Sequence, residues 1–166
     1  RTFTPDAEVG TGRAGAATGQ LVNFGQVGRC LYVPNDTVGS SFLAIWPCLQ
    51  RPTGTMQWSQ VWKLPAPTGT NTFGTGTIFT TTGGQNYCLL SPGSTTGYVK
   101  VQLCSSAPAA AIQWTRQYGT GVFANTYRIE STYGAPAGTT YCLAPTDPTA
   151  GTPDLWQGAS KAILQI

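Results

Sequence analysis

The sequence contains no histidine and has few charged residues. Its 166 residues include nine Lys and Arg and six Asp and Glu, so charged residues make up 9% of the chain. Histidine is the side chain that most often transfers protons or binds metals near neutral pH. The six carboxylates form no recognisable acid–base or metal-binding motif. The sequence therefore disfavours an enzyme and predicts no metal and no cofactor.

Long apolar segments and clusters of positive charge are also missing. No run of about 18 apolar residues occurs, so the sequence predicts no membrane span. The basic residues are scattered singly between Arg1 and Lys161, which argues against a nucleic-acid partner. No signal peptide begins at Arg1. If the chain forms disulfides, this absence indicates a mature chain from which a signal has been removed.

Glycine and proline are plentiful. The chain has 21 Gly and 12 Pro, with many Ser and Thr between them. This composition leaves little room for long exposed helices and is typical of a turn-rich all-β protein. The length is that of one domain.

One pattern recurs three times along the chain. It consists of Cys-Leu followed by a turn, then an alternating strand ending in Cys, then Gln-Trp ten residues later. The copies contain Cys30, Leu43–Cys48 and Gln57-Trp58; Cys88, Val99–Cys104 and Gln113-Trp114; and Cys142 with Ala162–Ile166. The predicted repeats cover residues of about 20–76, 77–126 and 127–166, and the third ends at Ile166 before a second Cys. Repeats of this length predict one closed β structure, because a single copy cannot bury its own apolar side.

Each copy is predicted to form short strands. They are expected at 21–24, 29–33, 42–46 and 58–64, at 78–81, 86–90, 98–103 and 114–118, and at 127–130, 141–143 and 161–166. Loops are expected at 65–77, 131–140 and 143–160. Leu31, Leu89, Leu143, Trp58 and Trp114 are predicted to be buried. Residues 1–19 show neither helical nor strand periodicity and are interpreted as an extended arm, either a linker or a segment that docks on a partner subunit.

The five cysteines are spaced for disulfides rather than for zinc. Pairing Cys30 with Cys48 and Cys88 with Cys104 closes two loops of similar size at equivalent places, each worth about 3 kcal/mol in the loop-entropy model. Such bonds persist in secreted proteins. Cys142 is left over. It is either a free buried thiol or the partner of a cysteine beyond Ile166.

The repeated Cys-Leu, Cys and Gln-Trp pattern resembles that of the ricin B-type lectins over residues 20–166. The resemblance implies a β-trefoil fold and a secreted, non-catalytic protein that binds glycans. In that family an Asp two places after the first Cys accepts bonds from sugar hydroxyls, an aromatic near the second Cys stacks on the sugar ring, and an Asn before the Trp adds a hydrogen bond. Some ricin-type trefoils are binding subunits of cytolethal distending toxins.

This chain keeps part of the family's sugar site. The Asp position is Tyr32, Leu90 and Ala144 in the three copies, and the Asn position is Thr55 and Ala111 in the first two. The aromatic position is Trp46 in the first copy, but Gln102 and Gln165 in the others.

The resemblance thus makes the first copy the main candidate carbohydrate site. Trp46 would stack on the sugar, while Asn35, Asp36 and Tyr32 would supply polar contacts. In the alternative interpretation, Trp46 packs against Pro47 and Tyr32, and Asp36 bonds its own turn. The loop at 143–160 offers a second candidate site, formed by Asp147, Asp154 and Trp156.

Two functions follow as hypotheses. The first is a secreted lectin that recognises cell-surface glycans. The second is a degenerate lectin trefoil that joins protein partners in a secreted toxin complex, which the loss of the Asp in every copy and the arm before residue 20 favour. A trefoil protease inhibitor is a third class, and no loop of the sequence marks one.

Overall fold

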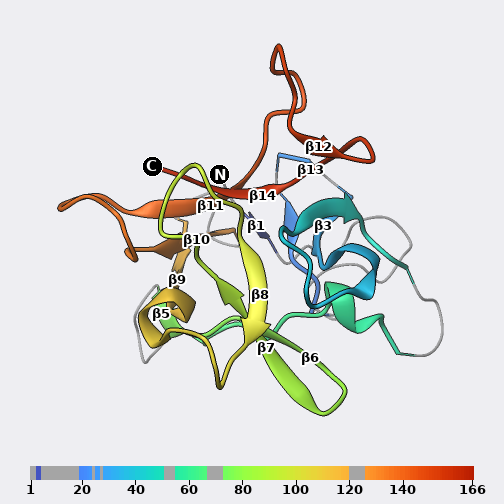
Figure 1. Ribbon diagram of the computed structural model, residues 1–166, viewed down its shortest axis with the longest axis horizontal. Helices are drawn as coiled ribbons and strands as arrows, with labels where there is room; N and C mark the ends of the chain where they lie inside the picture. The colour runs from blue at the N-terminus through green and yellow to red at the C-terminus, as the bar shows by residue number, and fades with distance from the viewer. Residues whose placement is uncertain are drawn as a thin grey trace.

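Strands dominate the computed structural model of this protein. The structure describes residues 3–4, 19–23, 25–26, 28–50, 55–66, 73–119 and 126–166. Its strands are β1 (Phe3–Thr4), β2 (Val22–Asn23), β3 (Arg29–Tyr32), β4 (Ala44–Pro47), β5 (Phe73–Gly76), β6 (Phe79–Thr82), β7 (Gln85–Leu90), β8 (Lys100–Leu103), β9 (Trp114–Tyr118), β10 (Tyr127–Ser131), β11 (Tyr141–Pro145), β12 (Leu155–Trp156), β13 (Ala159–Ser160) and β14 (Ala162–Gln165) (Figure 1). Three short 3-10 segments accompany them: η2 (Pro34–Asp36), η3 (Trp58–Gln60) and η4 (Ala109–Ile112). The predicted all-β class is confirmed.

The three sequence copies share one strand register. Each copy has a pair of antiparallel strands, β3–β4, β7–β8 and β11–β14. The first Cys of each copy faces an equivalent residue: Cys30 faces Trp46, Cys88 faces Gln102 and Cys142 faces Gln165. The next pairs are Leu31 with Ile45, Leu89 with Val101 and Leu143 with Leu164. The alignment of Trp46, Gln102 and Gln165 made from the sequence therefore holds in space.

A ring of backbone hydrogen bonds joins the three copies. The N–H of Leu43 donates to the carbonyl of Val99 (3.0 Å), Val99 donates to Ala162 (3.0 Å), and Ala162 donates back to Leu43 (2.8 Å). All three residues are completely buried. Leu43, Val99 and Ala162 lie two positions before Ile45, Val101 and Leu164, which are the residues that pair with the leucines. The ring therefore links equivalent points of the three copies.

The three copies share one hydrophobic core. The predicted core residues Leu31, Leu89 and Leu143 are each 0% exposed, as is Trp114. They belong to one cluster of buried side chains, whose other members include Leu21, Val33, Leu43, Ile45, Ile78, Val99, Val101, Ile129 and Leu164. The indole N–H of Trp114 donates to the carbonyl of Leu89 at 2.8 Å, which satisfies a buried acceptor.

Trp62, and not Trp58, is the counterpart of Trp114. The Trp62 indole N–H donates to the carbonyl of Leu31 at 3.0 Å, as Trp114 does to Leu89. Trp62 is 3% exposed, whereas Trp58 is partly buried at the edge of the core. The alignment of Trp58 with Trp114 was wrong, because the spacing from the second Cys to the buried Trp is four residues longer in the first copy (Cys48 to Trp62) than in the second (Cys104 to Trp114). The aligned motif in the first copy is Gln60-Val61-Trp62.

The predicted strand at 58–64 is also wrong. Residues 58–60 form η3, and beyond it Lys63 makes an isolated bridge to Phe79. The buried Gln60 side chain explains the turn. Its amide oxygen accepts the N–H of Leu49 (2.8 Å), and its amide nitrogen donates to the carbonyl of Pro47 (3.0 Å). These bonds hold the chain against the loop after β4 instead of in a continuous strand.

Three segments predicted as irregular contain strands. β5 lies within the predicted loop at 65–77 and pairs with β9. The hairpin of β12 and β13 lies within the predicted loop at 143–160. Within the predicted arm, β1 pairs with β2 and β10 of the same chain, so this part of the arm contacts the chain itself. The rest of the arm up to residue 18 lies outside the described residues.

Both predicted disulfides are confirmed, Cys30 with Cys48 and Cys88 with Cys104. Cys142 is a free, partly buried thiol. Burial raises the pKa of this thiol most, and the negative charge of the nearby Glu130 carboxylate raises it further. In the described part of the chain no helix has the length and apolar character needed to cross a bilayer.

Replacing Trp62 tests its newly assigned role. We expect Trp62→Phe to lower the free energy of unfolding by about 2–3 kcal/mol, because it leaves a buried carbonyl without its donor and removes core volume. The matched variant Trp58→Phe should cost less than about 1 kcal/mol, since its indole N–H donates to no described residue. Denaturant unfolding measures both. Equal losses would restore Trp58 as the counterpart of Trp114.

Candidate functional site

Five aromatic side chains form a partly exposed cluster on the outside of the molecule. Its members, which we call the aromatic cluster, are Tyr32, Phe42, Trp46, Tyr98 and Trp156. The Trp46 and Trp156 ring centroids are 5.0 Å apart, and Tyr32 stacks beside Trp46 at 6.1 Å and 25°. Phe42 lies 6.1 Å from both Trp156 and Tyr98. None of the five rings is fully buried. The cluster therefore presents apolar ring surface to solvent.

Two strands and one hairpin place the central rings. On β4 Trp46 faces Cys30, and Tyr32 stands two residues further along β3, so Tyr32 and Trp46 project from the same face. The β12–β13 hairpin packs against β4, close to the bridge between Ala44 and Lys161 (Figure 1). This arrangement brings Trp156 of the third copy onto Trp46 of the first.

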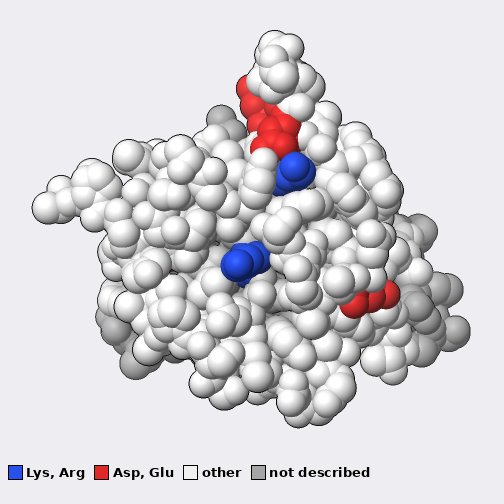
Figure 2. Space-filling view, in the orientation of Figure 1, with Lys and Arg blue, Asp and Glu red and all other residues white. Residues whose placement is uncertain are grey.

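An ion pair borders the cluster. The Lys161 ammonium lies 2.8 Å from Asp154 Oδ1, and the Tyr98 hydroxyl donates to Asp154 Oδ2. The same ammonium lies 4.7 Å from the ring centroid of Phe42 and 4.8 Å from that of Tyr98, within cation–π range. Figure 2 shows acidic and basic side chains side by side where the protruding loop meets a face with few other charges.

The pKa shifts reflect these contacts. The hydrogen bond from Lys161, then that from Tyr98, lowers the pKa of the Asp154 carboxyl. The hydrogen bond to Asp154 raises the pKa of both Lys161 and Tyr98. All three groups therefore keep their neutral-pH forms over a widened pH range.

Asn35 and Asp36 lie in the turn next to Tyr32. Both have positive φ angles, 53° and 54°, which Asn and Asp tolerate better than most residues. The Asn35 N–H donates to the Tyr32 hydroxyl (3.1 Å), and Gln57 Nε2 donates to Asp36 Oδ2 (2.8 Å). Burial, and secondarily the Asp36 charge, raises the pKa of Tyr32. The side chains of Asn35 and Asp36 are both exposed, and the Asp36 carboxylate accepts a hydrogen bond from Gln57 rather than from its own turn.

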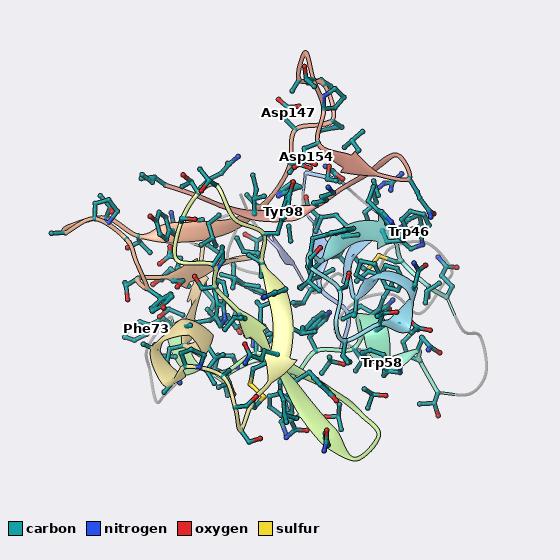
Figure 3. All side chains as sticks on the ribbon, in the orientation of Figure 1. Trp46, Trp58, Phe73, Tyr98, Asp147 and Asp154 are labelled. Atoms are coloured by element: carbon teal, nitrogen blue, oxygen red, sulfur yellow. A yellow bond between two sulfur atoms is a disulfide. The ribbon has the colours of Figure 1, made fainter. Side chains whose placement is uncertain are left out.

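Asp147 stands apart from the other predicted residues. Its carboxylate accepts bonds from the N–H and hydroxyl of Thr149, both at 2.8 Å, and so caps a turn of its own loop. Figure 3 shows it further out along this loop than Asp154 and away from Trp46.

The structure thus merges two candidate sites that the sequence kept separate. Tyr32 and Trp46 of the first copy join Trp156 and Asp154 of the third. The alternative of Trp46 packing on Tyr32 holds as well, because the two rings stack. Sequence reasoning missed Phe42, Tyr98 and Lys161. Each immediately precedes a member of the hydrogen-bonded ring, Leu43, Val99 or Ala162, so the repeat alignment makes the three positions equivalent, and their contacts reveal the shared role.

The positions equivalent to Trp46 have different surroundings. Gln102 borders a groove lined by Ser40, Ser41, Tyr87 and Lys100. Gln165 borders a second depression, lined by Arg128, Glu130, Thr140 and Cys142. The paired indoles distinguish the first of the three positions.

The arrangement offers a surface for binding. Within the described residues no three His, Cys, Asp or Glu side chains lie close enough to hold a metal ion. Ring faces bordered by a carboxylate, an ammonium and hydroxyls can contact a ligand that has both apolar C–H surface and hydroxyl groups. No protein-family model, curated protein or solved structure matches this chain.

Neutralising Asp154 should destabilise the protein in a pH-dependent way. Its pKa is lowered below 3.8 by folding, so its contribution is complete above that value and is lost as the pH falls through the lower folded value. Because the Asp154 side chain is 45% exposed, we expect Asp154→Asn to cost at most about 1 kcal/mol at neutral pH.

Thermal unfolding of both proteins across the acid range measures this difference. The two midpoints should converge as the pH falls through the lowered pKa of the Asp154 carboxyl. A gap of the same size at neutral and acid pH would show that the carboxylate charge contributes nothing.

Proposed function

We propose that this protein is a secreted carbohydrate-binding module with a β-trefoil fold and that its glycan site is the aromatic cluster. The observation that carries the proposal is the juxtaposition of Trp46 and Trp156, two partly exposed indoles from different copies, 5.0 Å apart. The shared register of the three copies and the hydrogen-bonded ring support a threefold-repeated trefoil. The two disulfides favour an oxidising compartment outside the cytosol.

A pyranose matches the chemistry of this surface. It has one face of C–H groups, which stacks on an indole, and a rim of hydroxyls, which bond to polar side chains. Asp154 and the hydroxyls of Tyr32 and Tyr98 stand around the rings. They offer acceptors and donors next to the platform although the family's Asp is absent from all three copies.

The charge of the site favours an uncharged sugar. Lys161, the cation that contacts two rings of the cluster, is neutralised by Asp154. Asp36 adds a negative charge close to Tyr32, because it follows Asn35, whose N–H donates to the Tyr32 hydroxyl, and this charge is a secondary cause of the raised pKa of Tyr32. A sialylated or sulfated glycan would meet this negative charge, and among the described residues the cation that contacts the cluster, Lys161, is already paired with Asp154. We therefore expect neutral hexose-containing glycans as ligands.

A second candidate function is that of an assembly subunit in a secreted toxin complex. The observation that favours it concerns the position of the family's Asp. In the second and third copies this position holds the buried apolar residues Leu90 and Ala144, which accept no hydrogen bonds from sugar hydroxyls. In this role the aromatic cluster would contact a protein partner instead of a sugar.

A glycan array of the wild-type protein and three alanine variants tests the proposal. We expect neutral glycans to be bound, and Trp46→Ala and Trp156→Ala each to weaken binding at least about tenfold, because each removes a stacking ring. Phe73→Ala is the matched control, since Phe73 is 43% exposed but lies away from the cluster (Figure 3). It should bind like wild type.

Absence of glycan binding by the folded wild-type protein would reject the lectin function and favour the assembly subunit. Binding that survives loss of either indole would place the glycan elsewhere on the surface.

A further inference from the structure

Phe42, Tyr98 and Lys161 occupy equivalent positions in the three copies. Each is the residue before a member of the hydrogen-bonded ring, Leu43, Val99 or Ala162. The three side chains lie together beside the hydrogen-bonded ring. There the Lys161 ammonium contacts the aromatic rings of Phe42 (4.7 Å) and Tyr98 (4.8 Å). One side chain from each copy therefore meets at the place where the copies join.

Asp154 connects this layer to the loop that carries Trp156. One carboxylate oxygen accepts from Lys161 at 2.8 Å and the other from the Tyr98 hydroxyl. A cation and a phenol from two different copies thus hold the residue two positions before Trp156. We call Lys161, Asp154, Tyr98 and Phe42 the Lys161 clamp.

Thr146 ties together the two ends of the same loop. Its hydroxyl donates to the carbonyl of Asp154 (2.6 Å) and accepts the N–H of Lys161 (2.9 Å). Its carbonyl accepts the Ser160 hydroxyl at 2.8 Å. Thr146 therefore holds both ends of the β12–β13 hairpin, residue 154 before it and residues 160 and 161 at its end.

The hairpin itself is too short to fix Trp156. Each strand has two residues, and the pair forms a separate two-stranded sheet. An isolated two-stranded hairpin is at best marginally stable in water, so its position depends on contacts outside it. The Lys161 clamp lies at both of its ends, through Asp154 before β12 and Lys161 after β13.

From this geometry we propose that the Lys161 clamp is the positioning device of the glycan site: it holds Trp156 against Trp46, so that the paired platform forms only when all three copies are joined. Lys161, Asp154, Tyr98 and Phe42 thus act as positioning residues through their contacts with one another, in addition to the polar groups that Asp154 and Tyr98 offer to the sugar. The inference rests on the proposed function for its effect on binding, but the indole pairing that it explains can be measured without any ligand.

The test combines a ligand-free signal with a binding measurement. Two adjacent indoles give an exciton couplet in circular dichroism, which the difference between wild type and Trp46→Phe or Trp156→Phe isolates. Lys161→Met removes the charge but keeps the aliphatic stem. We expect it to reduce the couplet by at least half and to weaken binding of a neutral glycan about tenfold.

Lys161→Arg is the conservative control, because it keeps the charge, the ring contacts and the pairing with Asp154. It should restore most of the couplet and the affinity. Tyr98→Phe keeps the ring but removes the hydroxyl that donates to Asp154. It should give a smaller loss of the couplet, and it tests the clamp even if Lys161→Met does not fold.

A full couplet in both Lys161→Met and Tyr98→Phe would overturn the clamp. A reduced couplet with unchanged glycan affinity would also overturn it, because Trp156 placement would then not matter to the site. If the wild-type protein binds no glycan, the proposed function fails, and the couplet alone decides whether the clamp positions Trp156.

Discussion

The closed ring of hydrogen bonds among Leu43, Val99 and Ala162 is the constraint on which the rest of this structure depends. Each bond joins a different pair of copies, and all three lie in the fully buried interior. A buried backbone N–H or carbonyl that loses its partner costs free energy comparable to a lost hydrogen bond. Displacing one copy would break two of the three bonds at once. The copies are therefore held together as a unit.

The candidate site is a consequence of this closure. No single copy contains it, because Trp46, Tyr98 and Trp156 come from the first, second and third copies respectively. The residues directly before the ring members bring the Lys161 ammonium between two aromatic rings, and the chain after β11 brings Trp156 onto β4. The same geometric relation that buries Leu31, Leu89 and Leu143 in the core thus assembles the aromatic cluster on the outside.

Much of the fold could be predicted from the sequence because the repeats carry it. Cysteine spacing predicted both disulfides, and the alternation of apolar residues located the central strands. The failures have physical causes. The four additional residues between Cys48 and Trp62 disguised which indole is buried, and a buried glutamine, Gln60, imposed a turn where alternation suggested a strand. The short hairpin of β12 and β13 follows from packing on β4, which no local pattern reveals.

The candidate site was predicted in parts. Tyr32, Trp46, Asp154 and Trp156 were identified from the sequence, but as members of two sites, since nothing local places the third copy's loop on the first copy's strand. Phe42, Tyr98 and Lys161 were overlooked because they are an unlike set: two aromatics and a cation at one repeat position suggest no shared role until the three are seen in contact.

Amide hydrogen exchange at the ring tests the central claim most directly. If the three copies close as one cooperative unit, the amides of Leu43, Val99 and Ala162 exchange with the same free energy of opening, equal to that of global unfolding. An amide that exchanges much faster than the other two would show that its copy opens separately. That result would contradict the dependence of the fold and its site on the closed ring.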